Sequence, residues 1–211
     1  AGLVWLAGAA WRHILALGML ALPVFGWAAM EPYRLRRITG FLDPWADPYG
    51  NGFQLVQALI AIGRGELFGV GIGASIQKLF YLPEAHTDFI FAVLAEEFGL
   101  VGVIIVLTLF LLLVTRIMVI GAMAHRKGRA FSGYVAYGIG LWLGLQAIVN
   151  VGVNLGVLPT KGLTLPLISS GGSSMLMTIV ALGVVLRIKY VLDRDFGAFE
   201  RVRKPSRRAA A

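Results

Sequence analysis

A carboxylate stands at the entrance of a long apolar run in this sequence. Asp88 ends the polar string Tyr-Leu-Pro-Glu-Ala-His-Thr-Asp, and Phe-Ile-Phe follows it directly. A carboxylate at such a place can take a proton from a reacting hydroxyl or hold a divalent cation. The structural alternative is that Thr87 or Asp88 caps a helix N-terminus, where side-chain oxygens bond free amides. Spacing alone leaves both interpretations open.

Two further acids lie inside the same apolar run. Glu96 and Glu97 follow Asp88 by eight and nine residues. On a helix that separation is about 12–13 Å, at about 1.5 Å per residue. Carboxylates at that depth are costly against lipid, so we expect them to face a polar cavity or a basic partner.

A polar stripe marks the next apolar run. Gln146, Asn150 and Asn154 recur every fourth residue and therefore share one helix face. They can bond to neighbouring helices, or they can line a hydrated cavity. The pairs Gly140/Gly144 and Gly152/Gly156 allow helices to approach closely.

A second polar segment follows, reading Leu-Pro-Thr-Lys-Gly-Leu-Thr-Leu-Pro and then Ile-Ser-Ser-Gly-Gly-Ser-Ser. Lys161 is its lone cation, and Ser169–Ser174 can cap the helix that comes next. The Gly-x-Ser-x-Gly pattern of a serine nucleophile is absent from this string, so its serines indicate binding or capping instead.

The composition indicates which kind of element must position these residues. Hydrophobic residues make up 58% of the chain and charged residues 14%, against about 25% charged in soluble domains. The net charge is +8, but the cations lie between and after apolar runs, which is typical of membrane proteins rather than nucleic-acid binders. Because Cys is absent, disulfides and thiolate chemistry are excluded.

Four apolar runs are long enough to approach a membrane span of about 20 residues. Each is best interpreted as a helix, because lipid offers no partner to an unpaired backbone group. The predicted fold is therefore all-α, a polytopic helical membrane protein with a large outer loop that contains short helices. The expected spans are Ile14–Met30, about Phe89–Thr115, Phe131–Pro159 and Gly171–Leu186.

Charge gives the orientation of these spans. The connection 125–130 holds three Lys or Arg and no acid, and the part after Leu186 holds eight against three, so both should face the cytoplasm. Residues 31–88 hold five Lys or Arg and six acids, so this segment belongs outside. It should contain a short amphipathic helix over Gln54–Ile62.

The expected organisation follows in chain order. Residues 1–30 hold the end of an earlier span and one outward span, and 31–88 form the extracytoplasmic loop that carries the site. Residues 89–192 form three spans with a second outer loop at 158–172, and 193–211 form a basic cytoplasmic tail. Since the chain lacks an initiator Met, we expect it to be the C-terminal part of a longer protein.

Several strings together resemble the SEDS family of bacterial cell-wall polymerases, and its division branch more than its elongation branch. The strings are Asp43–Tyr49, Gly63–Leu67, Gln77–Phe91, Leu158–Pro166 and Ile168–Ser174. The resemblance implies a ten-span protein in the bacterial cytoplasmic membrane that polymerises lipid II into peptidoglycan strands outside the membrane. The implied partners are undecaprenyl-linked glycan, an FtsI-like class B penicillin-binding protein and other membrane proteins of the divisome.

The resemblance also assigns roles to residues. Asp88 matches the essential Asp of the family and is expected to act as a base, as a ligand of Mg or Mn, or as both. No nucleotide, haem or nucleic acid is expected. The residues expected to contact substrate are Arg64, Lys78, His86, Thr87, Lys161, Ser170 and Ser173, and those expected to line a cavity are Glu96, Gln146, Asn150 and Asn154.

Two other functions fit the same residues. Polar groups inside the spans would suit a lipid II flippase or transporter. A non-catalytic scaffold that only docks the penicillin-binding protein is the other alternative. In either case we expect the second and third spans to bind the partner's single span, with Gly140 and Gly144 at the contact.

The charge pattern predicts which connections an impermeant reagent can reach. A cysteine replacing Lys161 should be labelled in intact cells, and one replacing Lys127 should be labelled only after the membrane is opened. This sequence has no Cys, so each variant carries a single target within it. Labelling of both positions, or of Lys127→Cys alone, would overturn the predicted orientation.

Overall fold

The computed structural model describes residues 10, 12, 15–16, 18–23, 41, 43–50, 52–75, 86–160 and 162–203, with side chains as far as Arg194. These residues form helices and loops, without a strand among them. Four helices organise this part of the chain: α4 (Phe53–Gly65), α5 (Ile90–Arg126), α6 (Ala130–Asn154) and α7 (Gly172–Arg203).

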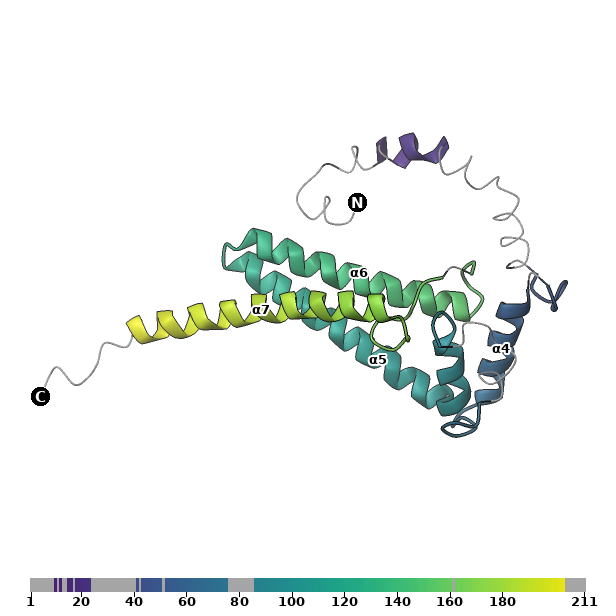
Figure 1. Cartoon of the computed structure of the whole chain (residues 1–211). Coiled ribbons are helices and arrows are strands. Elements are labelled where there is room, and N and C mark those ends of the chain that lie inside the picture. Colours follow the sequence, from purple (N-terminus) through teal and green to yellow (C-terminus); the bar gives the residue numbers. More distant parts are fainter. Residues whose placement is uncertain are drawn as a thin grey trace, which may run out of the picture.

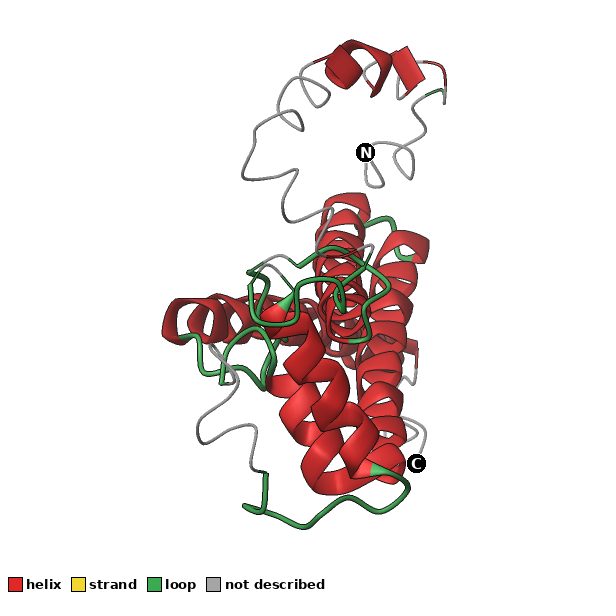
Figure 2. Cartoon of the chain, turned by 90° about the vertical axis from the view of Figure 1, so that its right-hand side faces the viewer, coloured by secondary structure: helices red, strands yellow, loops and turns green. Residues whose placement is uncertain are grey.

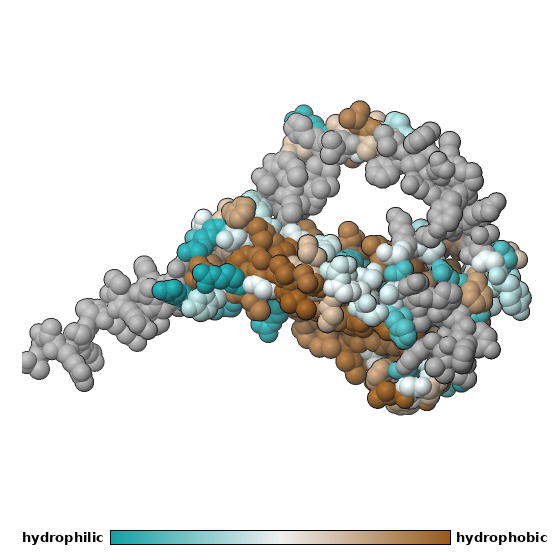
Figure 3. All heavy atoms as spheres, in the orientation of Figure 1, coloured by the Kyte–Doolittle hydropathy of each residue, from teal (hydrophilic) through white to brown (hydrophobic). Residues whose placement is uncertain are grey.

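Three of the four helices are long and apolar enough to cross a membrane, namely α5, α6 and α7 as far as Arg194. They run side by side, and hydrophobic side chains gather over their middle while hydrophilic ones lie toward both ends (Figures 1 and 3). The prediction of an all-α polytopic membrane protein is therefore confirmed. The predicted first span, Ile14–Met30, lies largely outside the described residues.

Two helices extend beyond the predicted spans, and one ends before its predicted span does. Helix α5 continues past Thr115 to Arg126, and α7 continues past Leu186 to Arg203, into the segment expected to be a tail. Each predicted span stops at the first cation of its apolar run, but the helix itself can continue beyond the membrane. Helix α6 ends at Asn154 rather than Pro159, because Gly156 adopts a positive φ of 68°.

Helices α5 and α6 form a tightly packed antiparallel pair. A buried cluster of Ile117, Ala136, Leu143 and Val185 joins them to α7. Gly140 is buried at the pair's contact, where an added Cβ would lie 3.2 Å from the Cγ2 of Ile117. The small size of Gly140 therefore serves the approach of α5 within this chain. The expected contact of Gly140 and Gly144 with a partner protein stays a prediction.

The short helix predicted at Gln54–Ile62 exists as α4, with one turn more at its end. It packs across one end of the bundle, against the start of α5 (Figure 1). Ala58 and Ala61 are fully buried in a cluster with Ala92, Val93 and Val153. Small residues on the buried face of α4 therefore bring its backbone close to α5 and α6.

Helix α5 is interrupted at Gly99, whose φ of 64° and ψ of −164° are not helical. The loop after α4 inserts at this break and replaces the lost bonds of the helix. Carbonyls of α5 accept from loop amides, and amides of α5 donate to loop carbonyls. The bonds are Val70 N to Glu96 O (2.9 Å), Gly71 N to Glu97 O (3.2 Å), Leu100 N to Glu66 O (2.9 Å) and Val101 N to Leu67 O (3.2 Å).

These hydrogen bonds between the loop and α5 explain how a broken helix is tolerated in an apolar segment. An unpaired backbone group in hydrocarbon costs several kcal/mol, so irregular backbone persists at membrane depth only when protein covers it. A side chain at position 99 would collide with the backbone of Leu67 and Gly69. Both conformation and space therefore require glycine there.

We predict that Gly99→Ala lowers the free energy of unfolding. The conformation alone costs a non-glycine residue about 1–3 kcal/mol, and the collision with the loop adds to that. Gly63→Ala is the matched control, because Gly63 is helical and exposed in α4 with open space around it. Thermal unfolding in detergent should show a lower Tm for Gly99→Ala alone, and equal Tm values would contradict the account.

Candidate functional site

Two loop segments far apart in sequence meet at one end of the bundle. The segment before α5 (residues 86–89) lies against the loop between α6 and α7 (155–171), and Figure 2 shows loops gathered at that end. The Oγ of Ser169 donates to the carbonyl of Thr87 at 2.6 Å. Ser170 donates to the carbonyl of His86 from both its amide (2.9 Å) and its Oγ (2.8 Å).

Two buried asparagines of α6 hold the main chain at Asp88. The side-chain amides of Asn150 and Asn154 donate to the carbonyl of Asp88 at 2.9 and 3.0 Å. Asn150 also donates to the carbonyl of Leu163 at 2.5 Å, so one side chain joins both loop segments. The two asparagines are 1% and 0% exposed. We call this arrangement the asparagine clamp.

The clamp also caps α5. The N-cap residue of α5 is Phe89, and it makes no side-chain capping bond. The carbonyl oxygen of the Asn154 side chain instead accepts from the amide of Ala92 at 3.2 Å. The same amide also donates to the carbonyl of Phe89 at 3.0 Å, so a residue of α6 adds a bond in the first turn of α5. A capping role for Thr87 or Asp88 stays a prediction.

The carboxylate of Asp88 lies against the second loop. A Cβ built on Gly162 would be 3.2 Å from the Oδ2 of Asp88, which places that oxygen beside the Gly162 backbone. Asp88 is half-buried and His86 is exposed, so this place remains open to a substrate. Lys161 and Lys78, both expected to bind substrate, lie outside the described residues.

Glu96 lies in α5, eight residues after Asp88, and forms a separate polar cluster with Ser75 and Arg64, which we call the Glu96 node. It is 0% exposed, and its carboxylate accepts from Ser75 Oγ at 2.5 Å and from Arg64 Nη1 at 3.2 Å. Of the two environments expected for this acid, the structure shows the basic partner. Arg64, expected to bind substrate, is thus bonded to Glu96, and the node fixes the loop that fills the break at Gly99.

The remaining predicted residues are distributed around the two loops. Gln146 donates to the carbonyl of Thr164 at 2.8 Å, which adds another bond between α6 and the second loop. Ser173 is exposed in the first turn of α7. The polar stripe of α6 therefore bonds to neighbouring segments, and its hydrated-cavity role stays a prediction.

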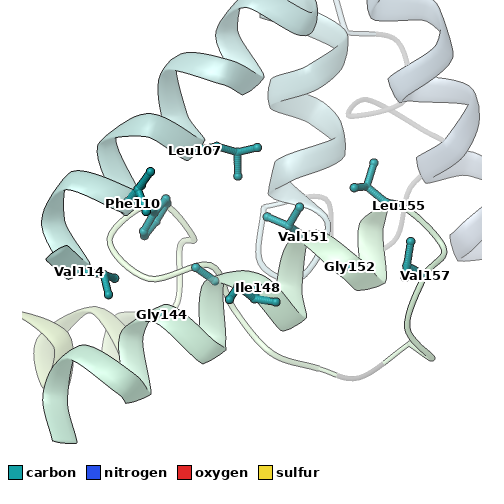
Figure 4. A pocket seen from close by; sticks show the side chains of 11 residues that line it. Leu107, Phe110, Val114, Gly144, Ile148, Val151, Gly152, Leu155 and Val157 are labelled. Atoms are coloured by element: carbon teal, nitrogen blue, oxygen red, sulfur yellow. The ribbon is translucent and has the colours of Figure 1, made fainter. Parts of the chain in front are cut away.

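An apolar groove lies on another side of α6, between this helix and the second part of α5 (Figure 4). Its volume is about 470 Å³. The residues that line it are Leu107, Phe110, Leu111, Val114, Gly144, Ala147, Ile148, Val151, Gly152, Leu155 and Val157. Such a groove suits hydrocarbon or an apolar helix rather than a charged group.

A divalent cation at Asp88 would need ligands beyond this side chain. Among the described residues, no cluster of three His, Asp or Glu side chains is suited to a metal. Mg²⁺ in proteins is commonly held by one or two carboxylates with water and substrate phosphates. Asp88 would supply one such carboxylate, and a Mg or Mn ion at this place stays a prediction.

Sequence reasoning missed Ser75, Ser169 and Gly162. Ser75 carries no local signal, because its partner Glu96 is 21 residues away. Ser169 lies in a serine- and glycine-rich string that predicted a cap for α7, yet its hydroxyl binds the first loop segment. Contacts of this kind depend on the packing of helices and leave no periodic pattern.

Together these features define a polytopic helical membrane protein with a candidate site where two loops cover one end of its helices. A family model described as a cell cycle protein, of the FtsW, RodA and SpoVE type, matches residues 1–193. The chain therefore belongs to this family, and the resemblance to SEDS proteins is confirmed.

Curated relatives of the chain carry the name probable peptidoglycan glycosyltransferase FtsW. The protein of Nitrosococcus halophilus is 58% identical over 89% of this chain and 49% of its own length. That of Coxiella burnetii is 59% identical over 89% of this chain and 51% of its own length. The chain thus spans about half the length of these relatives.

A solved structure is similar as well. It is described as showing "structural coordination of polymerization and crosslinking by a peptidoglycan synthase complex". The identity is 34% and the TM-score 0.66, over 90% of this chain and 52% of that one. The helical arrangement described above is therefore shared with a protein of known structure.

We predict that Asn154→Leu loosens the segment before α5. Leucine keeps the branched shape but removes one donor from the buried Asp88 carbonyl and one acceptor from the Ala92 amide, at about 1–3 kcal/mol. Hydrogen exchange of amides 86–93 should become faster. Thr108→Val is the control, because the hydroxyl of Thr108 bonds only within exposed α5, to the carbonyl of Ile104. Unchanged exchange in Asn154→Leu would remove the clamp's proposed role.

Proposed function

We propose that the protein containing this chain is a peptidoglycan glycosyltransferase of the division type, which polymerises lipid II at the outer face of the bacterial cytoplasmic membrane. The observation that carries the proposal is the position of Asp88. The clamp fixes its main chain, while its half-buried carboxylate points at the second loop. The FtsW name of relatives near 58% identity supports the same activity.

The reaction needs a base at such a place. The hydroxyl of the acceptor sugar attacks C1 of the sugar at the end of the growing strand. The new C–O bond forms as the bond from C1 to undecaprenyl pyrophosphate breaks, and the hydroxyl proton passes to the base. A positioned base contributes about 10²–10⁴ in rate. In this proposal Asp88 takes that proton.

The leaving pyrophosphate needs positive charge. Lys161 adjoins Gly162, against which the Asp88 carboxylate lies, so its chain position favours a role for this lysine with the pyrophosphate. A Mg or Mn ion bound by Asp88 and the pyrophosphate would supply charge in the same way. Lys78, His86, Thr87, Ser170 and Ser173 remain proposed substrate contacts, with the first outside the described residues.

The orientation of the helices supports an outer site. Asp88 lies at one end of the bundle, and the basic connection between α5 and α6 lies at the other (Figure 1). Positive charge is retained on the cytoplasmic side, so the Asp88 end is proposed to be outside. Both substrates are lipid-linked, and an outer loop layer at the helix ends is where their reacting groups lie.

The transporter alternative finds less support in the described residues. A translocation path requires polar groups that face an open route. Glu96, Asn150 and Asn154 are instead buried and bonded to nearby backbone, Ser75 and Arg64. The groove beside them is apolar.

The same groove suits the proposed partner, a class B penicillin-binding protein with a single membrane span. Between helices in lipid, association depends on close van der Waals packing. The groove between α5 and α6 offers a concave apolar surface for such packing, with Ile148 at 67% and Leu111 at 64% exposure on its lining. We therefore place the partner's span there rather than at Gly140.

Tryptophan at Ile148 or Leu111 should fill the groove and lower co-purification of the penicillin-binding protein. Leu186→Trp is the matched control, because Leu186 is 67% exposed on α7 and outside the groove. Normal yields of complex from both groove variants, with properly inserted protein, would exclude this docking site.

Asp88→Asn should slow lipid II polymerisation by about 10² or more while the protein still folds and binds its partner. Asparagine keeps the size of the side chain but neither takes the proton nor binds a divalent ion well. Asp193→Asn is the control, since Asp193 is exposed near the other end of α7 and pairs with Lys189. Near-normal polymerisation by purified Asp88→Asn would refute the assignment and direct attention to Glu84, Glu96 and Glu97.

A further inference from the structure

The loop after α4 contains a run of residues without a polar side chain. Residues 67–74 read Leu-Phe-Gly-Val-Gly-Ile-Gly-Ala. Its three largest side chains are exposed, at 58% for Leu67, 81% for Phe68 and 82% for Ile72. Large apolar side chains gathered at an exposed place mark a site of interaction with protein or membrane. We call these three side chains the loop patch.

The loop patch lies where α5 bends. In Figure 1 the first part of α5 lies alongside α4, the longer second part runs along α6, and the loop lies at the bend. The loop bonds to the backbone on both sides of Gly99. The second part of α5 carries no charged residue from Gly99 to Thr115. It begins with large apolar side chains that are 46–54% exposed, namely Leu100, Val101, Ile104 and Ile105.

The patch therefore adjoins the end of an apolar surface on a helix that is long enough to cross a membrane. A lipid bilayer that covers this surface of α5 ends at the level of the bend, where the headgroups begin. Large apolar side chains at that level can enter the boundary between headgroups and acyl chains. The position of the patch along α5 thus matches the edge of the hydrocarbon.

The main chain of the loop is already bonded within the protein. The carbonyls of Glu66 and Leu67 accept from amides of α5, and the amides of Val70 and Gly71 donate to carbonyls of α5. The amide of Gly69 donates to the carbonyl of Gly65 at 2.7 Å. Water would satisfy such groups in an ordinary surface loop, whereas hydrocarbon offers them no partner. A bonded main chain with apolar side chains is therefore what insertion into lipid requires.

We propose that the loop patch inserts into the lipid leaflet at the Asp88 end of the bundle, with acyl chains packed against it. Interfacial segments place their apolar side chains about 5–10 Å into the boundary between headgroups and acyl chains. Contacts between helices in a membrane favour small residues, whereas this patch consists of Leu, Phe and Ile. Inserted in this way, the loop holds the Glu96 node at the level of the membrane surface.

The proposal does not rest on the polymerase activity, and it is tested by the depth of the loop in a bilayer. The full-length protein, in a form without other cysteines, carries F68C or I72C with a nitroxide spin label and is reconstituted in phosphatidylcholine vesicles. Collisions of the label with oxygen, which concentrates in hydrocarbon, are compared with collisions with a water-soluble nickel chelate. I104C on α5 is the reference for lipid, and D193C, whose side chain is 61% exposed, is the reference for water.

Labels at 68 and 72 should collide more with oxygen than with nickel, as at I104C. Nickel collisions as frequent as at D193C would place the loop in water and overturn the proposal. Low access to both reagents would show that another part of the protein or a partner covers the patch, which would overturn it equally.

A second measurement leaves the loop unchanged. Wild-type protein in vesicles with a diazirine on the acyl chain of phosphatidylcholine should be photolabelled in its tryptic peptide 65–78. F68D/I72D should lose about 10-fold or more of this labelling, since two large side chains no longer favour hydrocarbon. Y49D, at a side chain that is 90% exposed outside the loop, should be labelled like the wild type. An unlabelled peptide in the wild type, or equal labelling of F68D/I72D, would overturn the proposal.

Discussion

The bond between two buried amides and one carbonyl holds the candidate site together. Asn150 and Asn154 reach from α6 to the carbonyl of Asp88, and the same two side chains hold the second loop and cap α5. A buried amide left without partners costs about 1–3 kcal/mol. Each of these bonds therefore also favours the geometry that the other bonds of the two asparagines need. The main chain at Asp88 is consequently held in place by α6, and its carboxylate lies beside the second loop.

The membrane imposes the second constraint on this architecture. The backbone of α5 leaves its helical path at Gly99, and each group released there must find a partner within the protein. The loop after α4 supplies those partners, and the bond from Ser75 to Glu96, which also pairs with Arg64 of α4, fixes the end of this loop. The chain leading toward Asp88 is thus anchored before residue 76 by this node and after residue 85 by the asparagine clamp.

Much of the fold could be predicted from hydrophobic run length and charge, because both follow from the cost of placing polar groups in lipid. The sequence also identified Asp88, Glu96 and the stripe of Gln146, Asn150 and Asn154. It could not identify their partners, which are 13 to 66 residues away along the chain. At Gly140, for example, the small residue predicts a close contact between helices but does not identify the helix that makes it.

The central claim is that the two loops meet at Asp88, and a disulfide tests it most directly. Cysteines replacing His86 and Ser170 should cross-link within one chain under mild oxidation, because the amide of Ser170 donates to the carbonyl of His86 at 2.9 Å and disulfides need nearby backbones. With a protease site placed at Gly128, the cleaved halves should stay joined until reduced. Halves that separate without reductant, in protein that is otherwise folded, would contradict the account.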